Sequence, residues 1–495
     1  MGRQKWLGDK IPLLNCDSEN HGLVAADEAP ADQVESPTSE KEFETTNQKG
    51  IGWLVAAYFI IADIAGGGVV TLPKAIMNAG GYFNGLIVTT VVCSIFCYTG
   101  ILLGENWLIM MKRWPMYRKH CRHPYPSMAF RSIGKNARII TSATLNVMLY
   151  GVSVVYLLLS SKIINDMVGL FFNLHFGECK MLVLLAFVLW PLVMCKSPQD
   201  FWWAILAAMS TTLCAVILIL IGIIRDSPEC KPAATFPTFE FTKLVTSLGI
   251  FMFGFGGHGV FPSICQDMKT PRQFKSSVIL AFIIVCLLYV PVALLAYSTY
   301  GDALSDSVLN SIQTQRIQEL ANLFIALHCI LTLSIVINPL SNELEHYLNA
   351  PHEFGLHRII IRSGLLCTII FVALTVPSFG PILNLLGGTT VALTSGVYPC
   401  LFNLFLRANE NVSRHETKSL KSTIQMVIRK TSFLRLFVNL TIIVLTIICG
   451  IITSRAALIE LSNSSFSVPC YFPSYKPALP SHTLCCGKFK NISPL

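Results

Sequence analysis

The feature that most constrains this chain is a series of continuous apolar blocks, each about twenty residues long, with the charged residues collected between them. A helix needs that length to cross the hydrocarbon of a bilayer, and blocks that do not alternate in polarity exclude a β-barrel. Because 53% of the 495 residues are hydrophobic and only 13% are charged, a soluble core of ordinary size does not hold them. The sequence therefore predicts an all-α integral membrane protein.

About eleven transmembrane helices are predicted from the blocks. The first group lies near Trp53–Met77, Leu86–Met111, Ile139–Ile164, Met181–Cys195 and Phe201–Ile224. The second group lies near Val245–Cys265, Ser277–Tyr297, Leu320–Leu340, Ile359–Val376, Ile382–Leu406 and Phe433–Ile452.

Polar composition marks the two ends of the chain. Residues 1–49 lack a cleavable signal peptide and are predicted to form a disordered cytoplasmic tail, followed by a transmembrane domain over 50–453 and an outer, cysteine-containing tail over 454–495. Basic residues gather in the loop after the second block, which predicts a cytoplasmic amino terminus and an extracellular or luminal carboxyl terminus. The net charge of +9 then belongs mostly to the cytoplasmic face, and no nucleic-acid partner is expected.

Cysteines outside the blocks point to the oxidising side of the membrane. Cys179 and Cys230 fall in two short outer loops, where either a disulfide between them or two free thiols too far apart to meet fits the sequence. Cys470, Cys485 and Cys486 in the outer tail are able to pair as well, with a connectivity that the sequence does not reveal.

Short motifs suggest processing and sorting. Asn463 and Asn491 are predicted glycosylation acceptors in the outer tail. Near the amino terminus, Asp9 precedes Leu13 and Leu14 with the spacing of an acidic dileucine signal for endosomes or lysosomes, a pattern that also arises by chance.

Two blocks carry glycine clusters that weaken a helix inside the membrane. The first span contains ADIAGGGVVTLP and the sixth contains FGFGGHGVFP, and in both a proline, Pro73 or Pro262, follows the cluster's glycine pair by the same interval. Unwound backbone at membrane depth is tolerated where it lines a cavity, so two matched interruptions predict an inverted-repeat transporter with its site at the midplane. The alternative is that these glycines serve only close helix packing.

The strings AGGGVVTLPKAIMNAGG, FGFGGHGVFPSICQDMKTP and GGTTVALTSGVYPCLF resemble the amino acid/auxin permease family, especially its proton-coupled and vesicular branches. The resemblance runs from about Gly50 to Ile452. It implies a LeuT-like fold of two inverted five-helix repeats with discontinuous first and sixth helices and one further helix. It also implies ion-driven transport of small neutral amino acids by alternating access.

The resemblance assigns the substrate site to the two interruptions. The carboxylate of an amino acid would meet backbone amides of the first cluster, at Ala65, Gly66, Gly67 and Gly68. The amino group would face carbonyls around Phe253, Gly254 and Phe255, and side-chain selectivity would depend on these phenylalanines and on Tyr150. Tyr150 is equally consistent with a packed core aromatic.

Asp63 is the first candidate for ion coupling, because an acid within the membrane is costly unless it is paired, neutralised or part of an ion path. His258 is the second, with a purely structural role holding the broken helix as its alternative. Proton-coupled relatives tend to carry a histidine near the place of Phe59, so the coupling ion is either H⁺ or Na⁺, and no other cofactor or metal is expected. Lys74 departs from the usual residue after Leu-Pro, and the sequence does not explain it.

No motif of an enzyme appears in the context that it requires. An amino-acid-binding nutrient sensor with a transporter's fold is the main alternative function, and a channel is the third. The sequence does not identify the amino acid, the oligomeric state, or whether the membrane is the plasma membrane or that of an endosome or lysosome.

Overall fold

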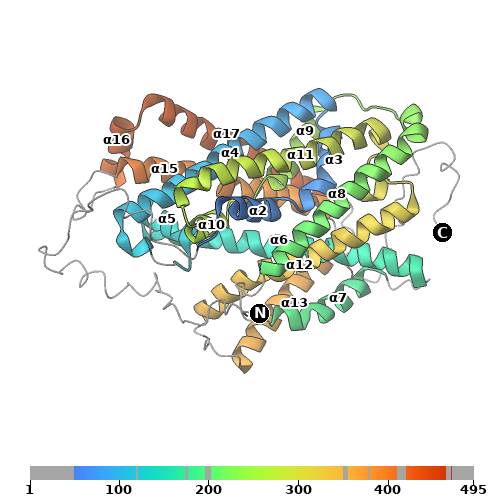
Figure 1. The fold of residues 1–495 in the computed structure, drawn as a ribbon, viewed down its shortest axis with the longest axis horizontal. Helices are drawn as coiled ribbons and strands as arrows, with labels where there is room; N and C mark the ends of the chain where they lie inside the picture. Colours follow the sequence, from blue (N-terminus) through green and yellow to red (C-terminus); the bar gives the residue numbers. More distant parts are fainter. Residues whose placement is uncertain are drawn as a thin grey trace, which may run out of the picture.

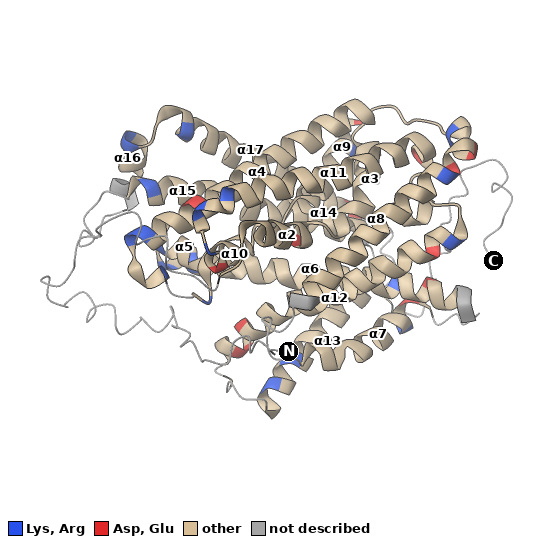
Figure 2. Ribbon diagram, in the orientation of Figure 1, with Lys and Arg blue, Asp and Glu red and all other residues tan. Residues whose placement is uncertain are grey.

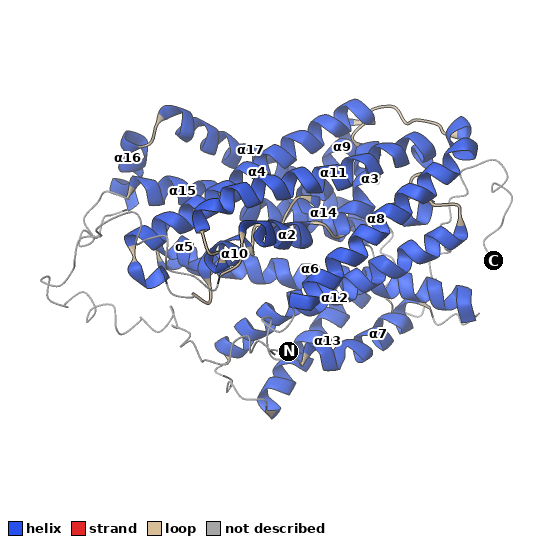
Figure 3. Cartoon of the chain, viewed as in Figure 1, coloured by secondary structure: helices blue, strands red, loops and turns tan. Residues whose placement is uncertain are grey.

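The computed structural model describes residues 50–118, 121–172, 177–194, 202–348, 350, 355–376, 379–409, 420–463 and 470. Regular structure in these ranges is helical throughout (Figure 3), apart from one isolated backbone pairing between Ile51 and Met268. The prediction of an all-α protein is confirmed. The predicted tail 1–49, with the sorting residues Asp9, Leu13 and Leu14, lies outside the described residues.

The first half of the chain contains the helices that match the first five predicted spans, with short helices between them (Figure 1). They are α2 (Trp53–Ile64), α3 (Gly67–Asn78), α4 (Tyr82–Arg113), η3 (Pro115–Arg118), α5 (Pro124–Ser132), α6 (Lys135–Phe172), α7 (Glu178–Val193), α8 (Trp202–Cys230) and η5 (Lys231–Ala233).

The second half contains the remaining spans, of which the tenth includes a π-helical segment, η9. The elements are α9 (Phe241–Gly254), α10 (Phe261–Asp267), η6 (Pro271–Gln273), α11 (Phe274–Tyr300), η7 (Gly301–Ala303), η8 (Val308–Ser311), α12 (Gln315–Tyr347), α13 (Leu356–Thr375), α14 (Phe379–Leu386), η9 (Gly387–Val397), α15 (Tyr398–Ala408), α16 (Leu420–Lys430) and α17 (Phe433–Asn463).

Eight helices of the described ranges are long and apolar enough to cross a membrane, and the bent pair α2 and α3 makes a ninth. The other two predicted spans match α7, with 16 residues, and the interrupted pair α9 and α10, with 14 and 7 residues. Each is shorter as a single helix than the thickness of the hydrocarbon requires. By length alone, fewer helices of the described ranges qualify as transmembrane spans than the eleven predicted. Every predicted span nevertheless corresponds to a helix or to an interrupted pair of helices.

The two interrupted spans run antiparallel to each other. α2 contacts α10 and α3 contacts α9, so the first half of each span faces the second half of the other. α2 lies at the centre of the view in Figure 1, and α11 packs along both α2 and α3. On another side of the core, α12 packs against α6 and α8. This arrangement places both interruptions in the interior of the bundle, where exposed backbone groups are shielded from lipid.

Basic residues gather at one end of the bundle, around α5, α15 and α16 (Figure 2). We call this the basic end and define it by Arg113, Arg131 and Lys430, which lie in the last turns of α4, α5 and α16. The opposite end carries η7 and the loop between η7 and η8. This uneven distribution of basic residues between the two ends is the basis for predicting a cytoplasmic amino terminus. The orientation in the membrane stays a prediction.

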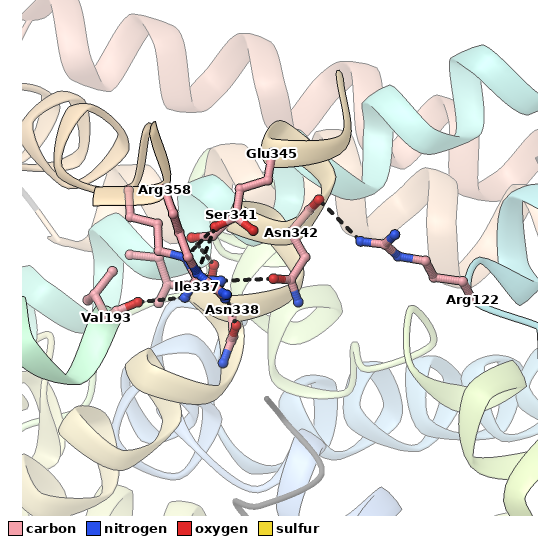
Figure 4. Close-up of polar contacts among 9 residues, drawn as sticks. Arg122, Val193, Ile337, Asn338, Ser341, Asn342, Glu345 and Arg358 are labelled. Atoms are coloured by element: carbon pink, nitrogen blue, oxygen red, sulfur yellow. Dashed lines mark hydrogen bonds and ion pairs between the residues drawn. The ribbon is translucent and has the colours of Figure 1, made fainter. Parts of the chain in front are cut away.

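An ion-pair network ties three helices together (Figure 4). Arg362 in α13 is fully buried and donates hydrogen bonds to Glu345 and Asn342 in α12, at 2.5 and 2.8 Å, and to the Val193 carbonyl of α7 at 2.7 Å. Arg122, which precedes α5, donates to the Asn342 carbonyl at 3.4 Å. A buried guanidinium is tolerated because each of its bonds is charge-assisted.

Candidate functional site

The first interruption lies at the beginning of the glycine cluster in the first span. α2 ends at Ile64 and α3 begins at Gly67, with a bend of 58° between the two half-helices. The first amides of α3 have no partner within their own helix and carry the positive end of its dipole. The predicted carboxylate-binding residues therefore lie where an anion is stabilised.

The second interruption spans residues 255–260, between the end of α9 at Gly254 and the start of α10 at Phe261. At the C-terminal end of α9 the last carbonyls lack helical partners and carry the negative end of the dipole, which suits an ammonium group. Both predicted interruptions are therefore present.

The two interruptions meet in space. A Cβ atom placed on Gly68 would lie 2.9 Å from the Cα of Gly254, and one placed on Gly67 would lie 3.5 Å from the ring of Phe253. On the other side of the gap, a Cβ on Gly257 would lie 2.6 Å from Asp63 Oδ2. The close approach requires glycine at position 68, because any side chain would collide with backbone.

Asp63 borders open space inside the bundle. Protein atoms surround it at membrane depth, yet the side chain itself is exposed. The carboxylate is therefore accessible beside Gly257 of the second interruption instead of being packed into the core. This is the position that an ion-coupling acid requires, and the assignment of that role remains a prediction.

His258 is enclosed by packing. Its Nε2 lies 2.9 Å from the Phe96 carbonyl of α4 and 3.0 Å from the Thr99 hydroxyl, and its ring stacks on Phe261 with centroids 4.7 Å apart. The ring is completely buried. These contacts favour the structural alternative, in which the imidazole donates to a carbonyl and holds the broken helix against α4.

The predicted aromatic residues take different positions. Phe253 is half-buried and faces Gly67, whereas Phe255 is fully buried and packs against the Tyr289 ring, with centroids 5.6 Å apart. Tyr150 is half-buried against the core. The tyrosine of α6 that reaches the first interruption is Tyr156, one and two-thirds turns further along, and helical geometry puts the two on different faces.

Three side chains that the sequence analysis missed surround the first interruption. The Tyr289 hydroxyl of α11 donates to the Ile64 carbonyl at 2.8 Å. A Cβ on Gly66 would lie 2.9 Å from both the Tyr156 hydroxyl and His328 Nε2. His328 lies within the predicted span Leu320–Leu340, so its presence as an ionisable residue in the membrane was an available signal.

The late glycine-rich string also packs at the site. It forms η9, whose Val391 side chain lies 2.4 Å from a Cβ placed on Gly256. A π-helical segment is rare and often marks a functional region. A hollow of about 670 Å³ lies on a different side of η9, between Gly388 and Arg455 of α17, and does not include the residues of the interruptions.

Lys74 has a structural partner. Its Nζ donates to the Leu304 carbonyl at 2.5 Å, which joins α3 to the loop between η7 and η8. Asp302 and Asp306 lie within electrostatic reach. The lysine that the sequence left unexplained therefore attaches the second half of the first span to the loop at the end opposite the basic end.

The predicted disulfide between Cys179 and Cys230 is wrong in its pairing. Cys179 pairs with Cys470, with Cα atoms 5.7 Å apart, and Cys230 is bonded to a different cysteine. The tail after α17 returns to the start of α7, and the Cys470 amide donates to the Leu374 carbonyl at 3.0 Å. Both cysteines are oxidised as expected, but the partner is a residue 291 positions away.

The last helix is longer than the predicted span. α17 continues past residue 453 to Asn463, which is its last residue, and the predicted division into a transmembrane domain and an outer tail stays a prediction. Glycosylation of Asn463 stays a prediction, and Asn491 lies outside the described residues.

Comparison with known proteins is informative at this point. The family described as "Transmembrane amino acid transporter protein" matches residues 49–456. "Amino acid transporter AVT1J" of Arabidopsis thaliana is 25% identical over 69% of this chain and 79% of its own length. "Amino acid transporter AVT1D" of the same plant is 25% identical over 68% of this chain, which spans 60% of that relative. The solved structure titled "Inward facing conformation of Mhp1" aligns at a TM-score of 0.48 and 10% identity, over 86% of this chain and 93% of that one.

Proposed function

Because this chain belongs to the transmembrane amino acid transporter family, we propose that it is an ion-coupled secondary transporter of small neutral amino acids that works by alternating access. The substrate site is the gap where the two interrupted spans meet. The single observation that carries the proposal is the close approach of Gly68 and Gly254, which brings a helix N-terminus and a helix C-terminus to one point.

Those two helix ends have the charges that a zwitterion needs. The carboxylate binds the amides that begin α3 at Gly67, and the ammonium binds the carbonyls that end α9 at Gly254. The antiparallel contacts of α2 with α10 and of α3 with α9 support the inverted repeat that the family resemblance implies.

The space around the gap supports a small substrate. The Phe253 ring stands across from Gly67, and the Tyr289 hydroxyl would lie 2.7 Å from a Cβ on Gly68, beside the Cα of Gly254. Side chains such as those of glycine and alanine fit between these rings more readily than large ones. A neutral side chain is favoured because the side chains nearest to Gly66, Gly67 and Gly68 in the described residues are the aromatic or imidazole groups of Tyr156, Phe253, Tyr289 and His328.

Asp63 supplies the coupling group. A carboxylate that borders open space in the bundle is able to bind a proton, which we propose as the coupling ion, and it is equally able to bind Na⁺. The ion neutralises this charge and so lowers the cost of enclosing the carboxylate within the bundle.

The test is uptake of labelled glycine, alanine and proline into liposomes that contain the purified protein. An imposed pH gradient, a sodium gradient and no gradient are compared for the wild type, Asp63→Asn and the control Asp302→Asn, whose carboxylate is exposed in the outer loop. We expect acid-driven, saturable uptake that Asp63→Asn reduces to the level seen without a gradient and that Asp302→Asn retains.

Two results would overturn the proposal. Saturable binding of amino acids without uptake under any gradient would identify a sensor instead of a transporter. Uptake that neither the pH gradient nor the sodium gradient accelerates would show that the protein is a facilitator, which transports amino acids without ion coupling.

A further inference from the structure

His328 lies in the middle of α12 and is almost completely buried, at 1% exposure. It faces the first interruption at Gly66 from α12, which packs against α6 and α8. The role proposed above for Asp63 does not involve this residue, and neither helix packing nor substrate binding at Gly67 requires an imidazole here. The ring therefore needs an explanation of its own.

One nitrogen of the ring is held by α8. Nδ1 lies 3.1 Å from the Ala208 carbonyl and 2.8 Å from the Thr212 hydroxyl. A carbonyl only accepts hydrogen bonds, so the neutral imidazole carries its proton on Nδ1. Thr212 also approaches the Ala65 carbonyl at 3.4 Å, which connects this anchor to the interruption itself.

The other nitrogen points at the interruption. Once Nδ1 is the donor, Nε2 carries the lone pair, and it lies 2.9 Å from the place of a Cβ on Gly66. The Tyr156 hydroxyl lies at the same distance from that point, and the Thr332 hydroxyl is 3.4 Å from Nε2. A basic nitrogen is thus aimed at the backbone where the α-carboxylate binds.

We propose that His328 accepts the transported proton on Nε2 and that the resulting imidazolium binds the carboxylate of the amino acid at Gly66. A proton from the aqueous phase adds to the Nε2 lone pair before or with the substrate, and it leaves from the same nitrogen when the substrate is released. Proton and substrate then stabilise each other's binding, because such coupling is reciprocal. The inference rests on the proposed ion-coupled transport and adds His328 to Asp63 as a second residue on which the coupling proton depends.

The surroundings permit a charge to form there. The titratable groups near the interruption are Tyr156 from α6, Asp63 from α2 and Tyr289 from α11, together with the adjacent Cys329 of α12. α8 contributes the uncharged Thr212 and the Ala208 carbonyl. The hydrogen-bond partners of the imidazole among the described residues are neutral, and Asp63 acts electrostatically on its neighbour Tyr156.

The experiment separates exchange from accumulation. Purified wild type, His328→Asn and His328→Gln are placed in liposomes, and two quantities are measured: exchange of labelled for unlabelled alanine at equal pH, and accumulation driven by a pH gradient. Asn keeps an amide donor at the position of Nδ1, and Gln places an amide at the position of Nε2. The control is His346→Asn, at the end of the same helix.

We expect His328→Asn to exchange alanine only with a higher half-saturating concentration, because the carboxylate loses a binding partner, and its accumulation ratio to fall to one. His346→Asn should exchange and accumulate like the wild type. Acid-driven accumulation that persists in His328→Asn would overturn the inference, as would wild-type accumulation driven by sodium alone. If His328→Asn does not fold, His328→Gln decides between the same outcomes. Wild type that neither exchanges nor accumulates would instead contradict the proposed transport.

Discussion

The Tyr289 hydroxyl donates a hydrogen bond of 2.8 Å to the carbonyl of Ile64, the last residue of α2. A helix that ends inside a membrane has carbonyls without partners, and this bond satisfies one of them from α11. It connects a neighbouring span directly to the interruption at which the substrate is proposed to bind.

Tyr289→Phe is expected to lower stability by about 1 kcal/mol, because the Ile64 carbonyl keeps only the Gly66 amide as a partner, at 2.9 Å, and to weaken amino acid binding. Thermal unfolding in detergent and the KM of uptake measure the two effects. Tyr58→Phe is the control, since that hydroxyl makes an exposed bond of 3.2 Å to the Leu206 carbonyl. Equal behaviour of the two variants would contradict a role for the Ile64 bond.

Gly67→Ala and Gly68→Ala are adjacent substitutions with different expected outcomes. A methyl group at 68 meets the Gly254 backbone at 2.9 Å, which costs about 1–3 kcal/mol of overpacking and separates the two interruptions. A methyl group at 67 meets the Phe253 ring at 3.5 Å, an ordinary contact. Glycine uptake should be lost in Gly68→Ala and retained in Gly67→Ala. Retention in both would show that the spans need not touch.

The disulfide of Cys179 can be tested by peptide mapping. Cys470→Ser is expected to release a free thiol at Cys179, whereas Cys230→Ser leaves Cys179 oxidised. Alkylation without reduction, followed by mass spectrometry of the peptide that contains Cys179, distinguishes the two. Cys214→Ser, which removes a free cysteine, is the control. Alkylation of Cys179 in the Cys230→Ser variant would instead support the disulfide between Cys179 and Cys230 that the sequence suggested.

The ion pair of Arg362 and Glu345 should be essential for stability. Glu345→Gln leaves the fully buried guanidinium without its carboxylate, which costs about 3–5 kcal/mol. Glu240→Gln breaks the exposed pair with Lys243 and should cost less than about 1 kcal/mol. The difference is read from thermal unfolding in detergent. A small effect of Glu345→Gln would mean that Asn342 and the Val193 carbonyl suffice as partners.

His123 makes stability depend on pH at the basic end. Its Nδ1 lies 3.1 Å from Glu343, and burial lowers the pKa of His123 while the carboxylate opposes the shift without reversing it. The unfolded chain then binds a proton more readily, so stability is present above about pH 6.5 and falls as the pH decreases below it. Melting temperatures from pH 5 to 8 should show a shallower acid decline in His123→Gln. An equal fall of the melting temperature at acidic pH in His123→Gln would show that other titratable groups cause the pH dependence.

Much of the fold could be predicted because its causes are local. The apolar length of each block decides that it crosses the membrane, and the glycine clusters before Pro73 and Pro262 decide where two helices break. Both breaks occur at the predicted residues, with α2 ending at Ile64 and α9 at Gly254. Short spans such as α7 were also found, since their composition is apolar even where their length is small.

What the sequence determined by itself is therefore the all-α membrane class, the interrupted helices and the family resemblance. Tertiary structure alone decided that Tyr156 and not Tyr150 faces Gly66, that His328 is aimed at the interruption while His258 is packed against α4, and that Cys179 pairs with Cys470. The physical reason is that helices in this bundle are apolar on every side, against lipid and against protein alike. Periodicity then carries little information about rotation, and the facing residues depend on how distant helices pack.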